Sequence, residues 1–314
     1  MRRLLRILPV VAVSIAASVV ALAQQPQVFR AGTRSVLVDV AVRDGNRPIL
    51  GLAAGDFVVT DNGVRQTIDD VSVGAVPVDV TLFLGTMNRT EVRQLAALNE
   101  DLRRIGGLLR PDDRVRLLTL ENQVTDVTGW IRGGEADRMS VRLGGIQSLY
   151  DACFIAMMHR PDPDRRHLVI AVSDGVEQGS VLDSTRVRDV ARRAEAVLHL
   201  VLVTPTQLAP ERLRTTDQGY FFLRTTWFHV MADERGLDNL REAADLTGGD
   251  TRAVRDGTSI VETFQRAFDD FRQSYLLRYT MRDVEVGGWH EVHVEIPSRR
   301  GATIRARKGY FGGT

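Results

Sequence analysis

The amino-acid sequence predicts an α/β protein in which a doubly wound, mostly parallel sheet is inserted into a small β-sandwich-like domain. Three observations lead to this prediction. Apolar runs of strand length alternate with helical patterns between residues 76 and 273, and this alternation is typical of a parallel sheet covered by helices. Short β-prone segments precede and follow that region. Each outer segment has a marginal number of strands by itself, so pairing between the two is the economical arrangement.

The composition is that of an ordinary globular protein. Of the 314 residues, 44% are hydrophobic and 26% are charged, and 41 basic residues face 40 acidic ones. The formal net charge of +1 and the lack of a long basic run argue against a dedicated nucleic-acid-binding protein. Cys153 is the only cysteine, so an internal disulfide is excluded, and its apolar neighbours predict a buried side chain rather than a nucleophile.

The N-terminus has the pattern of a signal peptide. Arginines within the first six positions precede the apolar run 7–22, and Ala21-Leu22-Ala23 fits the small-residue cleavage rule. We therefore expect residues 1–23 to be removed and the chain to be exported to the periplasm or the extracellular space, with no membrane span after cleavage. The alternative is a retained membrane anchor, for which the apolar run is slightly short.

Residues 24–75 predict the N-terminal β segment. The runs 36–42 and 57–60 are β-prone, and each is followed by turn residues. Asn62-Gly63 signals a hairpin, since both residue types tolerate a positive φ. Extended structure then resumes over residues 65–73.

Residues 76–273 predict the α/β domain. Its strands are expected at 78–84, 114–121, 167–173, 198–203 and 251–255, with 124–127 extending or pairing with the second of them. Its helices are expected at 91–109, 148–159, 185–197, 236–247 and 259–271. Residues 205–235 break this rhythm and predict a long loop or insertion.

Residues 274–314 predict the C-terminal β segment, with strands at 275–281, 290–296 and 303–308. We expect these strands to pair with residues 24–75. The motif His290-Glu291-Val292-His293 alternates like a strand and lacks the spacing of a helical zinc site. Asp162, Asp164 and Arg165-Arg166 predict a charged loop before the strand 167–173.

The loop Gly85–Thr90 lies where this kind of fold binds ligands. It follows the apolar strand 78–84 directly. In doubly wound sheets the functional crevice lies outside the carboxyl ends of the strands. The residues of this loop are therefore the first candidates for a functional site.

Several short stretches occur in the order and spacing of a known family. They are Asp56-Phe57, Asp61-Asn62-Gly63, Val76-Pro77-Val78-Asp79, Gly144-Gly145, Ser148-Leu149-Tyr150-Asp151-Ala152, Ser173-Asp174-Gly175, Thr247-Gly248-Gly249, Tyr275–Thr280 and Arg305–Phe311. With them, nearly the whole mature chain resembles von Willebrand factor type A (VWA) domain proteins, specifically the exported acidobacterial VWFA-related family. The resemblance implies a VWA-type α/β fold.

The resemblance also implies a metal-ion-dependent adhesion site, from which this sequence departs. The family motif is Asp-x-Ser-x-Ser after the first strand, a Thr on a second loop and an Asp on a third, which suits the oxygen ligands of Mg²⁺. At those positions this chain has Gly85, Met87, Arg89, Gln147 and Asp174. Only Asp174 retains a suitable ligand. The resemblance therefore predicts a degenerate site with no cofactor.

Two alternatives concern the same loop. In the first alternative, the side chains with oxygen atoms are shifted by one residue from the family motif and, together with Asp174, hold Mg²⁺ weakly. These shifted residues are Thr86, Asn88 and Thr90. Alternatively, the guanidinium of Arg89 pairs with Asp174 and stands where relatives hold the cation. A third outcome leaves Arg89 in solvent.

The sequence thus predicts an exported, non-catalytic adhesion or scaffold module that binds another protein and no nucleic acid. Its candidate contact residues are Thr86, Asn88, Arg89, Gln147, Ser148, Asp174, Tyr220, Phe221, Phe222, Trp227 and Phe228. Aromatic and Arg side chains are favoured interface anchors. The competing prediction is an envelope enzyme that uses Asp151 and Asp174, although the sequence offers no paired base or nucleophile.

Overall fold

The computed structural model describes residues 35–85, 92–120, 123–142, 148–159, 162, 164–204, 234–255 and 258–312. Ser35–Thr314 cluster as one compact unit. Within the described ranges, no helix has the length and apolar character needed to cross a membrane. The predicted signal peptide, residues 1–23, lies outside the described residues.

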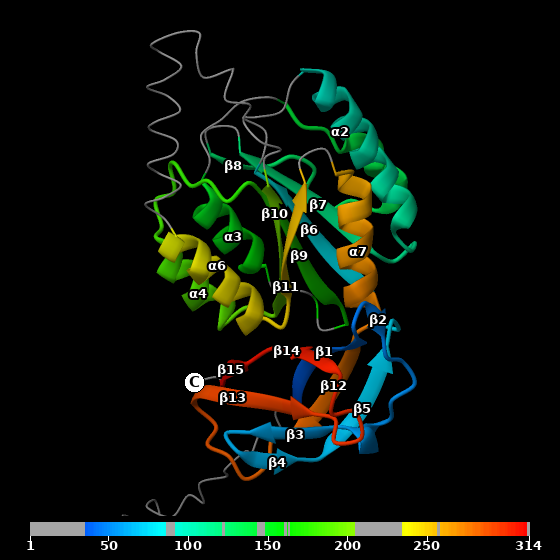
Figure 1. Ribbon diagram of the computed structural model, residues 1–314, viewed down its shortest axis with the longest axis vertical. Helices are drawn as coiled ribbons and strands as arrows, with labels where there is room; N and C mark the ends of the chain where they lie inside the picture. Colours follow the sequence, from blue (N-terminus) through cyan, green and yellow to red (C-terminus); the bar gives the residue numbers. More distant parts are fainter. Residues whose placement is uncertain are drawn as a thin grey trace, which may run out of the picture. The chain divides into compact units, whose positions relative to one another are not determined.

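Within the described residues, a six-stranded sheet forms the centre of the α/β part (Figure 1), in the order β11-β10-β9-β6-β7-β8. Its strands are β6 (Val78–Leu84), β7 (Arg114–Leu120), β8 (Val124–Asp126), β9 (Arg166–Ser173), β10 (Ala196–Thr204) and β11 (Asp250–Arg255). Neighbouring strands are parallel except β8, which is antiparallel to β7. Every residue of β6 and β9 is buried, which explains their apolar runs.

Helices cover both faces of this sheet. They are α2 (Val92–Ile105), α3 (Leu149–Met157), α4 (Ser184–Ala191), α6 (Glu234–Leu246) and α7 (Ile260–Arg272), with short 3₁₀ turns at Ala54–Asp56, Gly106–Leu108 and Gly133–Arg138. Figure 1 shows α2 and α7 on one face and α3, α4 and α6 on the other. Each face has its own apolar core. This three-layer arrangement confirms the predicted α/β class.

A β-sandwich is built from both ends of the described chain. One sheet has the order β14-β1-β12-β5 with β2 on β1, and the other has the order β15-β13-β3-β4. The strands are β1 (Ser35–Asp44), β2 (Arg47–Pro48), β3 (Val58–Asp61), β4 (Val64–Gln66), β5 (Ile68–Val73), β12 (Tyr275–Thr280), β13 (Gly288–Glu295), β14 (Thr303–Ala306) and β15 (Gly309–Gly312). An apolar core lies between the sheets.

The predicted pairing of N-terminal with C-terminal strands is confirmed. Strand β1 is antiparallel to both β12 and β14, and β3 is antiparallel to β13. The hairpin predicted at Asn62-Gly63 joins β3 to β4, with φ of 47° and 79° at its two residues. The α/β part is therefore inserted between strands of one sandwich.

Ion pairs connect the sandwich to the α/β part. Arg166 on β9 donates to Asp39 on β1 and to the carbonyl oxygen of Phe271 at the end of α7. Asp270 on α7 pairs with Arg43 on β1. Because α7 runs directly into β12, these pairs fix the helix end against the first strand.

Two predicted elements end earlier in the structure, and one strand was not predicted. The helix predicted at 185–197 ends at Ala191, because the small buried residues Ala194 and Ala196 belong to the turn and to the start of β10. The predicted strand 303–308 ends at Ala306. A further strand, β15, then joins the other sheet, where a Cβ on Gly309 would lie 2.2 Å from a backbone oxygen.

The charged loop predicted around Arg165-Arg166 contains Arg165 but not Arg166, and neither side chain is exposed. Arg166 is the first residue of β9 and is 5% exposed, and the side chain of Arg165 is 14% exposed. Each forms an ion pair with a buried or half-buried carboxylate. These partners lie far away in the sequence, so a local pattern could not show them.

Candidate functional site

Gly85 directly follows β6, and its surroundings leave little room for a side chain. Its N–H donates to the carbonyl oxygen of Val172 at 2.8 Å. A Cβ built on Gly85 would lie 3.0 Å from the ring of Phe83 and 3.4 Å from the hydroxyl of Ser173. A carboxylate-bearing residue at this position would therefore require the Phe83 ring to move.

Asp174 follows β9 at the same edge of the sheet. Its Oδ1 accepts the N–H of Val176 at 3.0 Å. Gly175 has a φ of 78° and donates its N–H to Ser173 Oγ at 3.1 Å. Asp174 is half-buried. Local hydrogen bonds thus fix the turn that carries this carboxylate.

The loop after β9 caps helix α3. Ser148 precedes the helix but makes no capping hydrogen bond with its side chain, and it is 5% exposed. Instead, the N–H of Tyr150 donates to Glu177 Oε2 and Ser180 Oγ, both at 3.1 Å. The carboxylate of Glu177 lies at a helix N-terminus, where negative charge is favoured. Ser148, a predicted contact residue, is therefore nearly covered.

Asp151 on α3 also binds the loop that follows β9. Its two carboxylate oxygens accept the N–H groups of Val181 and Leu182, each at 2.9 Å. Asp151 was the other carboxylate of the enzymatic alternative, and here both of its oxygens are engaged in holding a loop. Cys153, two residues further along α3, is fully buried, and burial raises the pKa of its thiol to about 12.

An open groove lies beside this helix at the C-terminal edge of the sheet. Its volume is about 430 Å³, and it is lined by Gln123, Val124, Ser148, Asp151, Ile155, Gly179, Val181 and Leu182. Val181 is 93% exposed and Ile155 is 42% exposed. Sequence analysis missed this groove, because neither apolar residue stands out in a local pattern.

The remaining predicted site residues lie outside the described residues. They are Thr86, Met87, Asn88, Arg89, Thr90, Gln147, Tyr220, Phe221, Phe222, Trp227 and Phe228. The shifted-register cation site and the pairing of Arg89 with Asp174 therefore stay predictions.

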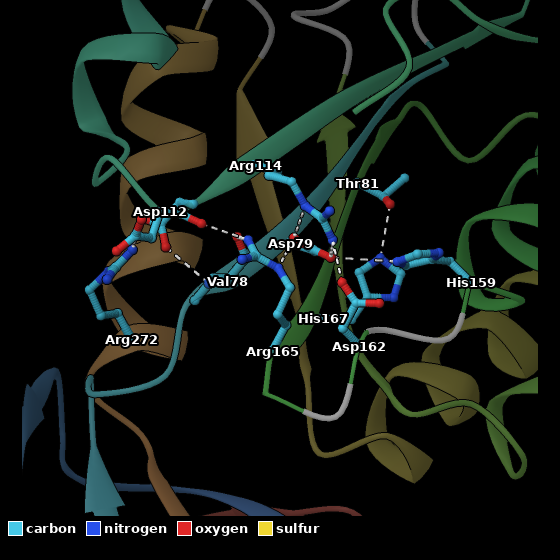
Figure 2. Close-up of polar contacts among 11 residues, drawn as sticks. Val78, Asp79, Thr81, Asp112, Arg114, His159, Asp162, Arg165, His167 and Arg272 are labelled. Carbon is cyan, nitrogen blue, oxygen red and sulfur yellow. Dashed lines mark hydrogen bonds and ion pairs between the residues drawn. The ribbon is translucent and has the colours of Figure 1, made fainter. Parts of the chain in front are cut away.

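A second polar cluster lies at the opposite ends of the strands (Figure 2). Asp79, fully buried on β6, accepts hydrogen bonds from Arg114 Nε at 2.8 Å and from Arg165 Nε at 2.6 Å. Nε2 of His159 lies 3.6 Å from the same carboxylate. Burial alone would raise the pKa of Asp79, but the two arginines outweigh it and hold that pKa below its usual value.

Two histidines complete this cluster. Oγ of Thr81 accepts from Arg116 Nε at 2.8 Å and lies 2.9 Å from Nε2 of His167. The Thr81 hydroxyl therefore links the guanidinium of Arg116 to the ring of His167. Trp130 packs over His159 with a ring separation of 4.6 Å. The cluster is closely packed and fixes the starts of β6, β7 and β9.

Acid is expected to destabilise the protein through His167. Burial, with smaller contributions from His159 and Arg116, lowers the pKa of His167 from 6.5 to about 3. Between these values the unfolded chain takes up a proton that the folded protein does not. The free energy of unfolding should therefore fall with pH across this window, by about 1.4 kcal/mol per pH unit for this residue.

Urea unfolding at about pH 7, 6 and 5 measures this effect. We expect the variant His167→Gln to lose stability less steeply than the natural protein as the pH falls. Parallel stability curves for the two proteins would show that His167 is not responsible.

Comparison with known proteins shows similarity in chain path at low sequence identity. No family model matches the sequence, and no curated protein matches it. Among solved structures, a von Willebrand factor type A protein from Catenulispora acidiphila is 12% identical, with a TM-score of 0.45 over 88% of this chain and 73% of its own. The conserved hypothetical protein BatB from Bacteroides thetaiotaomicron is 13% identical, with a TM-score of 0.41 over 63% of this chain and 98% of its own.

A third similar structure is proximal thread matrix protein 1 from the mussel byssus, with a zinc-occupied adhesion-site motif. It is 12% identical, with a TM-score of 0.46 over 68% of this chain and 50% of its own. All three structures match this chain with TM-scores below 0.5. At such identities the likeness concerns the fold alone.

Two of the expected adhesion-site positions, Gly85 and Asp174, lie among the described residues. Gly85 supplies no side-chain oxygen, and Asp174 supplies the one carboxylate among the described positions of the motif. Mg²⁺ requires near-octahedral coordination by oxygen atoms. Across the part of the chain that the structure describes, no group of three or more His, Cys, Asp or Glu side chains is arranged to hold a metal.

Proposed function

We propose that this protein is an exported, non-catalytic protein-binding module whose VWA-like domain contacts its partner without a bridging metal. The groove beside α3 carries the proposal. It lies at the edge of the sheet where doubly wound folds bind their ligands. It exposes aliphatic side chains, Val181 at 93% and Ile155 at 42%, and exposed apolar surface of this kind is typical of interaction sites.

The proposed loss of the metal site rests on Gly85. The leading carboxylate of the motif is absent there, and a Cβ at this position would lie 3.0 Å from the Phe83 ring. A role in contacts outside the cytoplasm is in keeping with the predicted signal peptide.

Calorimetric titration with Mg²⁺ and with Mn²⁺ tests the metal-free part of this proposal. We expect no binding tighter than roughly millimolar, because a single carboxylate and neutral oxygens hold these ions weakly. Tighter binding that Asp174→Ala abolishes would contradict the proposal.

The protein-binding part is tested by pull-down from the periplasm or secretome of the source organism. We expect the same partner to be captured in Mg²⁺ and in EDTA, and to be captured less well by the variant Val181→Ser. Capture that depends on the cation would favour an adhesion site of the metal-dependent type instead.

A further inference from the structure

Strand β8 has no partner strand on its outer backbone edge, beside the groove, among the residues that the structure describes. It is an edge strand that pairs only with β7 among the described strands. The N–H of Val127 donates to Leu117 at 2.9 Å, and Thr125 lies opposite Thr119. Because inward and outward groups alternate along an antiparallel strand, the backbone groups of Val124 and Asp126 point away from β7.

The outward groups of β8 and the groove lie next to each other. Val124 begins β8 and also lines the groove, and its side chain packs on the face of the sheet that α3 covers. A strand added to β8 would lie about 4.8 Å from it, with alternate side chains on the same face as Val124. Those side chains would enter the groove between Ile155 and Val181.

The charges around the groove restrict the occupant. Asp151 lines it, and Glu177 lies at the adjoining end of α3. Asp126, at the other end of β8, is exposed. These carboxylates disfavour an acidic segment and favour a basic residue opposite Asp126.

We propose that β8 binds an extended segment of another protein as an additional strand. The segment would place one aliphatic side chain in the groove and a basic side chain beside Asp126. Backbone hydrogen bonds would supply affinity and the groove would supply selectivity, as in other strand-addition complexes. This inference rests on the proposed protein-binding function and deepens it by specifying the form of the partner.

A phage-displayed library of random linear peptides, selected against the full chain, tests the proposal. We expect each enriched peptide to contain an aliphatic residue and a basic residue separated by one position. Their affinity should fall at least about tenfold for Ile155→Ser and for Val181→Ser, since each change removes apolar contact area. Met158→Ser is the matched control, because Met158 directly follows α3, is 60% exposed and does not line the groove.

Two experiments on the unsubstituted protein test the strand pairing itself. One measures hydrogen exchange of the backbone amides, and the other uses N-methylated peptides. A bound peptide should protect the amides of Val124 and Asp126 against hydrogen exchange, while Thr125 is already bonded to β7. N-methylation of the peptide should abolish binding at alternate positions only, since alternate N–H groups face β8.

Several results would overturn the inference. One is a peptide that binds without protecting the amides of Val124 or Asp126. Another is a peptide that still binds after N-methylation at every position. A third is a loss of affinity in Met158→Ser as large as in Ile155→Ser and Val181→Ser. A dimer of the free protein that Ile155→Ser dissociates would identify a second copy as the occupant. If the pull-down partner is still captured in any of these cases, the proposed function stands and the strand-addition mode alone fails.

Discussion

Replacing Asp79 with alanine is expected to lower the free energy of unfolding by about 3–5 kcal/mol. Asp79 is fully buried and accepts hydrogen bonds from Arg114 and Arg165. Removal of the Asp79 carboxylate leaves the guanidinium groups of both arginines partly buried and without their main acceptor. Loss of one partner of a buried ion pair is costly because the other charge stays desolvated.

Asp162 provides a matched control for this substitution. It pairs with the same Arg114 at 3.4 Å, but its side chain is 70% exposed. We expect Asp162→Ala to change stability by less than about 1 kcal/mol. Urea unfolding of the two variants and the natural protein measures both values. Equal effects of Asp79→Ala and Asp162→Ala would show that burial does not govern this network.

Replacing Asp61 with alanine is expected to destabilise the sandwich by a similar amount, about 3–5 kcal/mol. Asp61 and His290 are both fully buried, and Oδ1 of Asp61 lies 2.8 Å from Nδ1 of His290. The hydroxyls of Tyr279 and Tyr310 donate to Oδ2 at 2.8 and 2.6 Å. The substitution leaves three polar groups without their shared acceptor.

Asp70 is the control for Asp61, because its ion pair with Arg278 spans 3.6 Å between half-exposed side chains. We expect Asp70→Ala to cost less than about 1 kcal/mol. Thermal unfolding followed by near-ultraviolet circular dichroism reports on the tyrosines directly. An Asp61→Ala protein with unchanged unfolding temperature would contradict the structural role given to this cluster.

The elements of the fold could be predicted because they depend on local patterns. The run Val78–Leu84 predicts a buried strand from its apolar residues alone, and Asn62-Gly63 predicts a hairpin from backbone sterics. Polar residues inside that run, Asp79 and Thr81, were a usable sign of the second cluster, since buried polar groups require partners. Their significance was missed.

The partners of these polar residues could not be predicted. Asp79 and Arg165 are 86 positions apart, and Asp61 and His290 are 229 positions apart. One sequence contains no information that joins such distant positions before the fold is known. The groove depends in the same way on how the loop after β9 is fastened to α3 by Asp151.

The candidate site could be predicted only in part. The place of Gly85 and Asp174 at the ends of neighbouring parallel strands follows from the sheet topology. The amount of room around Gly85 does not, because it depends on the ring of Phe83 pointing toward it. Exposure of Val181 is likewise a property of the folded loop.

The pairing of the first strand with the last ones has a consequence for synthesis of the chain. Ser35 lies opposite Thr280, and Val42 lies opposite Ile304. Strand β1 leaves the ribosome long before β12 and β14 exist, and it remains without these two partners until the whole α/β part has been made. Contacts between such distant positions make folding slow. During that delay its alternating valines are open to wrong associations, so newly made chains should depend on chaperones until β12 and β14 arrive.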